Sequence, residues 1–133
     1  MPAGDAFTTQ QQHDIERAIR NAENAAGGLK FSVYVGGADE ETRPFARKLH
    51  ERLDDPDRSV LVYVDPPGRR LEIVTGAAAK RRLSDSQCGL AALTMQASFA
   101  AGDLTGGIVT GVQQLGEHAR QLPMLHTEHA DNT

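Results

Sequence analysis

The amino-acid sequence predicts an α/β protein, a three-layer α/β/α sandwich in which helices cover both faces of a small mixed β-sheet. Three observations carry this prediction. Residues 60–64 form an unbroken apolar run, typical of a strand that is buried on both faces. A connection of four or five residues joins this run to a second strand at 70–75, which predicts an antiparallel hairpin. Segments with helical spacing lie before and after the hairpin.

The first predicted helix begins near residue 8. Thr8 or Thr9 can cap it, with Gln11 or Gln12 completing a capping box. A Gly-Gly pair at 27–28 ends the helix, as a glycine after the last turn does. Its apolar face consists of Ile15, Ala18, Ile19, Ala22 and Ala26.

A strand at 31–35, a helix and the strand at 60–64 form a strand–helix–strand unit. This unit predicts a right-handed crossover between parallel neighbours. Asp39 is the predicted cap of the helix, with Glu40 and Glu41 in its first turn, and the helix is expected to stop near residues 54–56. Four of its side chains are expected to face inward: Phe45, Ala46, Leu49 and Leu53.

Two further helices are predicted after the hairpin. Gly76 ends the second hairpin strand, and Ser84 with Gln87 has the capping-box pattern for a helix from about 85 to 101. The last helix runs from about 104 to 122, where Gly107 and Gly111 are expected to allow close approach to a neighbouring element. The side chains expected to face the sheet from the first of these helices are Leu90, Leu93 and Ala97, joined by Cys88 or Met95. Those from the last helix are Ile108, Val112, Leu115 and Ala119.

Composition narrows the class of protein. The 133 residues suit a single domain at 7–122, between flexible segments at 1–6 and 123–133. The 18 acidic and 14 basic side chains give a net charge of −4, which argues against a nucleic-acid binder. Cys88 stands alone, so no internal disulfide forms, and a reducing compartment fits. No signal peptide or membrane-spanning run is recognisable, which predicts a cytoplasmic protein.

Several short motifs together resemble the TPM domain family, best known from a thylakoid-lumen phosphatase and its bacterial relatives. The resemblance covers about residues 7–120 and implies a compact α/β sandwich. For some members it also implies an acid phosphatase activity and a bound divalent cation, usually calcium. The motifs are Phe7-Thr8-Thr9, the apolar runs 31–35 and 60–64, Arg69-Arg70 before Leu71-Glu72-Ile73, Gly76, Leu83-Ser84-Asp85 and residues 99–107.

The match to the TPM pattern is partial at its most specific point. Members commonly carry a glycine-x-glycine-x-glutamate run after the second hairpin strand and then an aspartate at the helix start. Gly76 and Asp85 match this pattern, whereas Ala78 and Lys80 replace the second glycine and the glutamate. A cation there would lose a carboxylate ligand. We therefore predict an interaction or assembly module that binds a protein partner and has a degraded catalytic set. The alternative is a calcium- or magnesium-dependent acid phosphatase acting on a phosphorylated small molecule.

Four residues form the candidate polar site: Asp65, Gly76, Asp85 and Asp103. Asp85 and Asp103 are the candidate ligands of a calcium or magnesium ion, completed by backbone carbonyls and water. The competing interpretation is that both stabilise helix N-termini. Asp65 follows a buried strand, where ligands of α/β sheets bind, but it can equally shape the turn after it.

Basic and nucleophilic side chains supply the remaining candidates. Lys80, Arg81 and Arg82 can bind a phosphate or another anion, or can simply form a solvated face. Cys88, in the first turn of a helix, is either a thiol of lowered pKa or a small core residue. The remaining candidates are histidines, of which His126 and His129 form a weak zinc motif and His13, His50 and His118 are expected at the surface.

Overall fold

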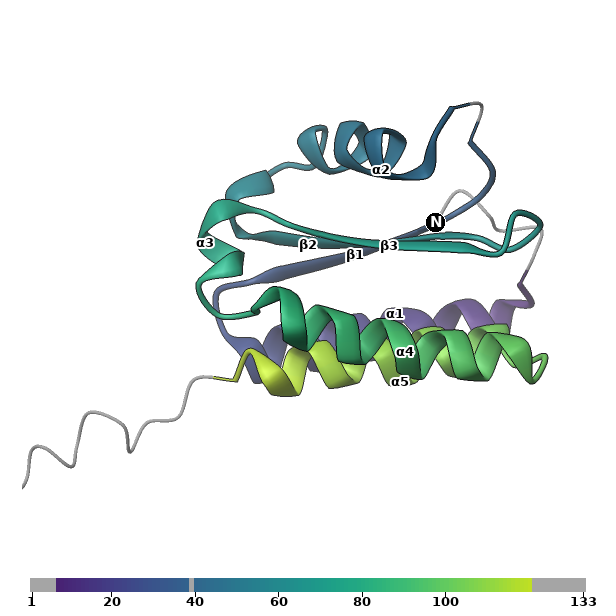
Figure 1. The fold of residues 1–133 in the computed structure, drawn as a ribbon. Helices are drawn as coiled ribbons and strands as arrows, with labels where there is room; N and C mark the ends of the chain where they lie inside the picture. The colour runs from purple at the N-terminus through teal and green to yellow at the C-terminus, as the bar shows by residue number, and fades with distance from the viewer. Residues whose placement is uncertain (1–6, 39, 121–133) are drawn as a thin grey trace, which may run out of the picture.

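The computed structural model describes residues 7–38 and 40–120, which form three layers (Figure 1). Some predictions concern residues outside the described ranges. These are the terminal segments 1–6 and 123–133, the cap Asp39, and the motif of His126 and His129. The elements, in chain order, are α1 (Thr9–Ala26), β1 (Lys30–Val35), α2 (Thr42–Glu51), the 3₁₀ turn η2 (Pro56–Arg58), β2 (Ser59–Asp65), β3 (Arg70–Thr75), α3 (Ala77–Lys80), α4 (Asp85–Ala100) and α5 (Leu104–His118).

The sheet has the order β1-β2-β3, with β1 parallel and β3 antiparallel to the central β2. Every residue of β2 is buried, as its continuous apolar run predicts. Helix α2 covers one face of the sheet, and α1, α4 and α5 cover the other (Figure 1). The predicted α/β sandwich with a small mixed sheet is therefore confirmed.

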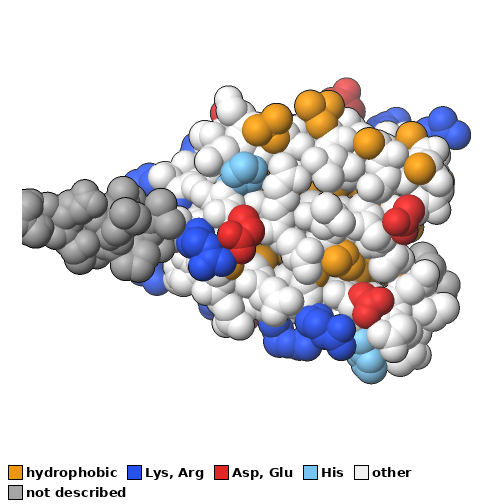
Figure 2. Space-filling view, turned by 90° about the horizontal axis from the view of Figure 1, so that it is seen from below, with side chains coloured by type: hydrophobic (Ala, Val, Ile, Leu, Met, Phe, Trp, Pro, Cys, Tyr) orange, Lys and Arg blue, Asp and Glu red, His pale blue; other side chains and the backbone are white. Residues whose placement is uncertain are grey.

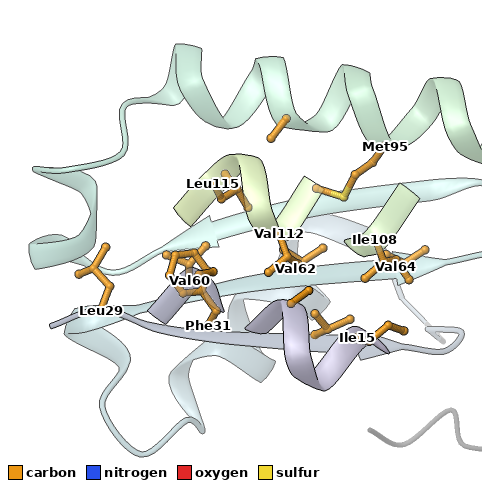
Figure 3. Packing of buried hydrophobic residues seen from close by; sticks show 14 of the residues in the cluster. Ile15, Leu29, Phe31, Val60, Val62, Val64, Met95, Ile108, Val112 and Leu115 are labelled. Atoms are coloured by element: carbon orange, nitrogen blue, oxygen red, sulfur yellow. The ribbon is translucent and has the colours of Figure 1, made fainter. Parts of the chain in front are cut away.

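The core is divided by the sheet. Alternate side chains of β2 point to the larger half, where Val60, Val62 and Val64 pack against α1 and α5 (Figure 3). On the other face, Tyr63 packs beneath α2, and its hydroxyl donates a hydrogen bond to the Gly36 carbonyl at 2.7 Å. Both faces of the central strand are thus needed for the core, which accounts for the absence of polar alternation in its sequence.

Both predicted capping boxes are present. Thr8 with Gln11 caps α1, and Ser84 with Gln87 caps α4. The predicted start of α2 was wrong, because that helix begins at Thr42 and Glu40 and Glu41 precede it. A helix starting after residue 39 would place Pro44 in its second turn, where the missing N–H would break a bond. Starting at Thr42 keeps the proline in the first turn.

The predicted inward face of α4 was wrong at three positions. Leu90 and Leu93 are 52% and 64% exposed, and Ala97 is exposed as well. Met95 is buried as predicted, together with Ala91, and Cys88 and Phe99 are half-buried on the same side. Helix α4 is apolar around most of its circumference, so spacing alone could not select the buried side.

The glycines of α5 explain which side of α4 is buried. A Cβ on Gly107 would lie 2.7 Å from Cε1 of Phe99, and one on Gly111 would lie 2.5 Å from Cε of Met95. The close approach predicted for these glycines is confirmed. The space above them is filled by the two largest side chains on that side of α4. The predicted stripe of α5 is also confirmed, since all four of its members are buried: Ile108, Val112, Leu115 and Ala119.

Within residues 7–38 and 40–120, no helix combines the length and apolar character that crossing a membrane requires. Helix α5 ends at His118, with Ala119 as its C-cap, so the predicted continuation was wrong at residues 119 and 120, and residues 121 and 122 lie outside the described chain.

Candidate functional site

The two candidate metal ligands lie at opposite ends of one helix. Asp85 is the first residue of α4, and Asp103 follows its last turn. The 16 residues of α4 span about 24 Å at 1.5 Å per residue. Ligands of one calcium or magnesium ion lie about 2–2.6 Å from it. The structure therefore does not bring Asp85 and Asp103 into one site.

In the segment that leads to the N-terminus of α4, Gly76 lets the chain pass close to the backbone of a neighbouring turn. A Cβ on Gly76 would lie 2.6 Å from the carbonyl carbon of Asp57, in the 3₁₀ turn η2. The Asp57 Oδ1 accepts a hydrogen bond from the Ala78 N–H at 3.2 Å, so this side chain lies at the start of α3. Asp85 is exposed and forms a 3.5 Å ion pair with Lys80. This loop is thus held by contacts within the chain.

Of the three predicted anion-binding residues, Arg82 has a structural role. Its guanidinium donates to the carbonyls of Ala26 and Gly27 at the end of α1 and, at 2.6 Å, to that of Ala119 at the end of α5. Helix C-termini carry such unsatisfied carbonyls, and a cation there is favourable. Arg81 is exposed. Lys80 and Arg81 are therefore the members of this group that a solvent-borne anion could reach.

At the other end of the sheet, Asp65 shapes the hairpin turn. It is 9% exposed, and its Oδ1 accepts a hydrogen bond from the Gly68 N–H at 3.2 Å. A Cβ on Gly68 would lie 3.0 Å from Cγ of Asp65, so glycine is needed there for space. The residue of this turn with a positive φ is Arg69, at 54°, and not the glycine. Asp103 similarly caps α5 through the Gly106 N–H at 2.9 Å.

A cavity of about 220 Å³ lies between α2, β3 and the start of α4, and Cys88 and His50 line it. Burial raises the pKa of the Cys88 thiol, and the charge of Asp85 adds to this, so the lowered pKa considered for it was wrong. His50 is buried, contrary to the surface position predicted, and its Nε2 lies 3.0 Å from the Ser59 carbonyl. Among residues 7–38 and 40–120, no three His, Cys, Asp or Glu side chains are grouped so as to hold a metal ion.

The most unusual surface is the outward side of α4. We define the α4 outer face by four exposed residues at helical spacing: Leu90, Leu93, Ala97 and Ala100. Apolar side chains gather along the upper edge of the helix layer in Figure 2, where the layer is seen from below. The sequence has no Asp, Glu, Lys or Arg between Asp85 and Asp103. This lack of charge was the signal that could have revealed the surface.

Comparison with known proteins identifies relatives of unknown role. The sequence matches the family described as Domain of unknown function (DUF5130) over residues 2–116. Two curated relatives come from Mycobacterium tuberculosis, uncharacterized protein MT2543 of strain CDC 1551 / Oshkosh and uncharacterized protein Rv2468c of strain H37Rv. Each is 26% identical over 87 residues, which are 65% of this chain and 52% of the relative. The chain thus spans about half the length of these relatives.

Solved structures share the fold. BA42 from the psychrophilic bacterium Bizionia argentinensis is 20% identical, with a TM-score of 0.76 over 85% of this chain and 81% of that one. The N-terminal domain of cg2496 from Corynebacterium glutamicum is 13% identical, with a TM-score of 0.71 over 87% and 76%. An N-terminal domain from P. gingivalis is 18% identical, with a TM-score of 0.72 over 84% and 75%. None of these names mentions a TPM domain, so that resemblance stays a prediction.

Proposed function

Because the chain belongs to the DUF5130 family, whose function is unknown, we propose from its geometry that it is a TPM-like interaction and assembly module. The α4 outer face is the proposed contact surface. The observation that carries this proposal is the exposure of Leu90 and Leu93, at 52% and 64%, on a helix side without charged residues. Contiguous apolar surface of this kind is typical of sites that bind another protein.

The two edges of the sheet are less suited to binding a partner. The carboxylate of Glu23 accepts a hydrogen bond from the Phe31 N–H of edge strand β1 at 2.9 Å. On the opposite edge strand, β3, the Arg43 guanidinium donates to the Ile73 carbonyl at 3.2 Å. Side chains that occupy edge groups in this way oppose pairing with an added strand. The helix layer is therefore the better candidate for association.

The proposed occupant of the α4 outer face is a second copy of the chain, with the two α4 helices antiparallel. Around a two-fold axis near residue 95, Leu90 of one protomer meets Ala100 of its partner. In the same way, Leu93 meets Ala97. Each large side chain then faces a small one, as interdigitated helix packing requires. The surface is self-complementary only in this antiparallel arrangement, because a parallel pair would place leucine against leucine and alanine against alanine.

Charge favours the same arrangement. A two-fold interface brings a residue near the axis close to its own copy, so a charged residue there would face a like charge. No Asp, Glu, Lys or Arg lies between Asp85 and Asp103. The antiparallel pairing also places the N-terminus of one α4 beside the C-terminus of the other, where the helix dipoles attract. Electrostatics thus offers no opposition in the central part of the seam, between residues 86 and 102.

The test combines sedimentation equilibrium with directed disulfide formation. We expect a concentration-dependent dimer of the wild-type chain in the micromolar-to-millimolar range, as small interfaces give. In a Cys88→Ala background, mixed Leu93→Cys and Ala97→Cys chains should oxidise to the mixed disulfide in preference to either symmetric one. A chain that remains monomeric at millimolar concentration, or symmetric Leu93→Cys dimers as the main product, would contradict the proposal.

The alternative function, a calcium- or magnesium-dependent acid phosphatase, draws its support from the TPM resemblance and from Asp85 and Asp103. The separation of these two residues along α4 gives it less support than the interaction proposal. The same protein preparation can test it, with a phosphomonoester substrate and added calcium or magnesium. Hydrolysis that is abolished by Asp85→Asn would favour the phosphatase. Hydrolysis by the wild-type chain at the background rate would count against the phosphatase and favour the interaction module.

A further inference from the structure

A second cavity lies at the end of the sheet where β1 and β2 finish, between the hairpin turn and the turn from α4 to α5. Its volume is about 460 Å³, within the range of small-molecule sites. Ligands of α/β proteins commonly bind outside the carboxyl ends of parallel strands, and this cavity occupies that position. It shares Ala100 with the α4 outer face, whereas Leu90, Leu93 and Ala97 of that face do not line the cavity.

The cavity has an apolar floor. Leu71 of β3, Phe99 of α4 and Leu104 of α5 line it, and all three also pack against the main core. Each is half-buried, so part of its apolar surface remains open to the cavity. Elements from both the sheet and the helix layer hold these side chains, which gives the floor a defined shape. Such a floor suits the apolar body of a small ligand.

Two of the four polar residues that line the cavity already have partners. The Asp65 carboxylate accepts the Gly68 N–H, and the Arg70 guanidinium donates to the Thr42 hydroxyl at 3.0 Å. The side chain of Arg69 also lines the cavity but makes no hydrogen bond or ion pair with any residue of the described ranges. Arg69 is thus the cation that remains available to a ligand.

The backbone of Arg69 strengthens this assignment. Its φ of 54° lies in the left-handed region, which glycine occupies at no steric cost. It is the one non-glycine residue with positive φ among the described residues. Strained backbone of this kind is concentrated at functional positions, where a particular side chain is needed in spite of the strain. Here the side chain kept at the strained position is an arginine at a cavity.

We propose that this cavity binds a small organic anion, with the Arg69 guanidinium pairing to its carboxylate or phosphate-type group and its apolar body on the Leu71–Phe99–Leu104 floor. Arginine presents a planar fork of donors that matches either anionic group. The Gln96 side chain, also at the cavity, can add a neutral hydrogen bond. Both an anionic head and an apolar body are therefore required for binding.

The test is an amide NMR titration with four probes: benzoate, phenylphosphonate, benzyl alcohol and acetate. We expect shifts around the cavity with benzoate or phenylphosphonate, and the stronger of the two identifies the preferred anionic group. Benzyl alcohol lacks the charge and acetate lacks the body, so each should bind at least about tenfold more weakly. Benzyl alcohol binding as tightly as benzoate, or no shifts at the cavity with either aromatic anion, would overturn the proposal.

Three variants separate the role of Arg69 from effects on folding. Arg69→Gln should weaken binding of the aromatic anion about tenfold or more, because it removes a charge-assisted pair. Arg69→Gly should weaken it equally while relieving the backbone strain, so unfolding cannot explain the loss. Arg81→Gln, which removes an exposed arginine at the opposite end of α4, should leave binding unchanged. Binding that survives both Arg69 substitutions would refute the assignment.

Discussion

Replacing Leu93 by glutamine is the sharpest perturbation of the α4 outer face. Glutamine is similar in length and forms helices nearly as well as leucine, so α4 itself should be preserved. Leu93 is 64% exposed in the single chain, and its removal therefore leaves little or no cavity in the core. The substitution should leave the stability of the monomer within about 0.5 kcal/mol of wild type.

The effect on the dimer follows from the exposed fraction. Complete burial of a leucine side chain contributes about 1.5–3 kcal/mol. The 64% of Leu93 that a partner would cover corresponds to about 1–2 kcal/mol. A two-fold dimer buries two copies of Leu93, so the lost contribution to dimerisation is about 2–4 kcal/mol. Leu93→Gln should therefore raise the dimer dissociation constant roughly 30- to 700-fold.

Sedimentation equilibrium over a range of concentrations measures this constant, and urea unfolding of dilute protein measures the stability of the monomer. Arg17→Gln on α1 is the matched control, because it changes an exposed residue of the same helix layer away from α4. We expect Arg17→Gln to leave both quantities unchanged. A dissociation constant that moves less than about threefold in Leu93→Gln would refute the reasoning, since the exposed leucine would then not be covered by a partner.

Three further outcomes are expected from other parts of the fold. Gly89→Ala should stabilise the chain by about 1 kcal/mol, because open space surrounds the new methyl group. Gly111→Ala should be about 1–3 kcal/mol less stable than Gly89→Ala, because its methyl group meets Met95. Equal urea midpoints for the two variants would contradict this packing. Arg82→Met should lower the free energy of unfolding by about 2–4 kcal/mol, because it leaves the helix-end carbonyls without donors, and Arg82→Lys should recover part of this loss. An unchanged urea midpoint in Arg82→Met would show that these hydrogen bonds are dispensable. Because burial raises the pKa of Cys88, its alkylation rate should rise at higher pH than that of a free cysteine. The same shift contributes stability that is present at neutral pH and is lost as pH rises through the folded pKa. An alkylation rate whose pH midpoint is at or below that of a free cysteine would contradict the burial.

Much of the fold could be predicted from local patterns. Capping boxes need only a few adjacent residues, and those at Thr8 and Ser84 both form as predicted. The continuous apolar run of β2 and the short connection after it were enough to predict a mixed sheet. The buried side of α4 was not predictable in this way, because it depends on contacts with the glycines of the following helix, α5. Tertiary contacts, rather than periodicity, select between two apolar sides of one helix.

The candidate site was harder to predict because one residue type serves two purposes. An aspartate before a helix or in a turn offers the same oxygens to a cation and to a backbone N–H. Asp65 and Asp103 each accept an N–H from the residue three positions on, and Asp57, which was not a candidate, accepts that of Ala78. Sequence spacing alone could not separate these roles. Only the distances between the aspartates show that they serve separate segments.

The contrast between α1 and α4 is the strongest reason to assign a role to the α4 outer face. Both helices lie in the same layer against α5 and the sheet. The outward side of α1 carries charged residues of both signs, including Glu16, Arg17 and Arg20, as a helix that faces water usually does. The outward side of α4 instead exposes two leucines. Packing on the sheet cannot require leucine at exposed positions, and the contact with a second copy proposed above would account for both leucines.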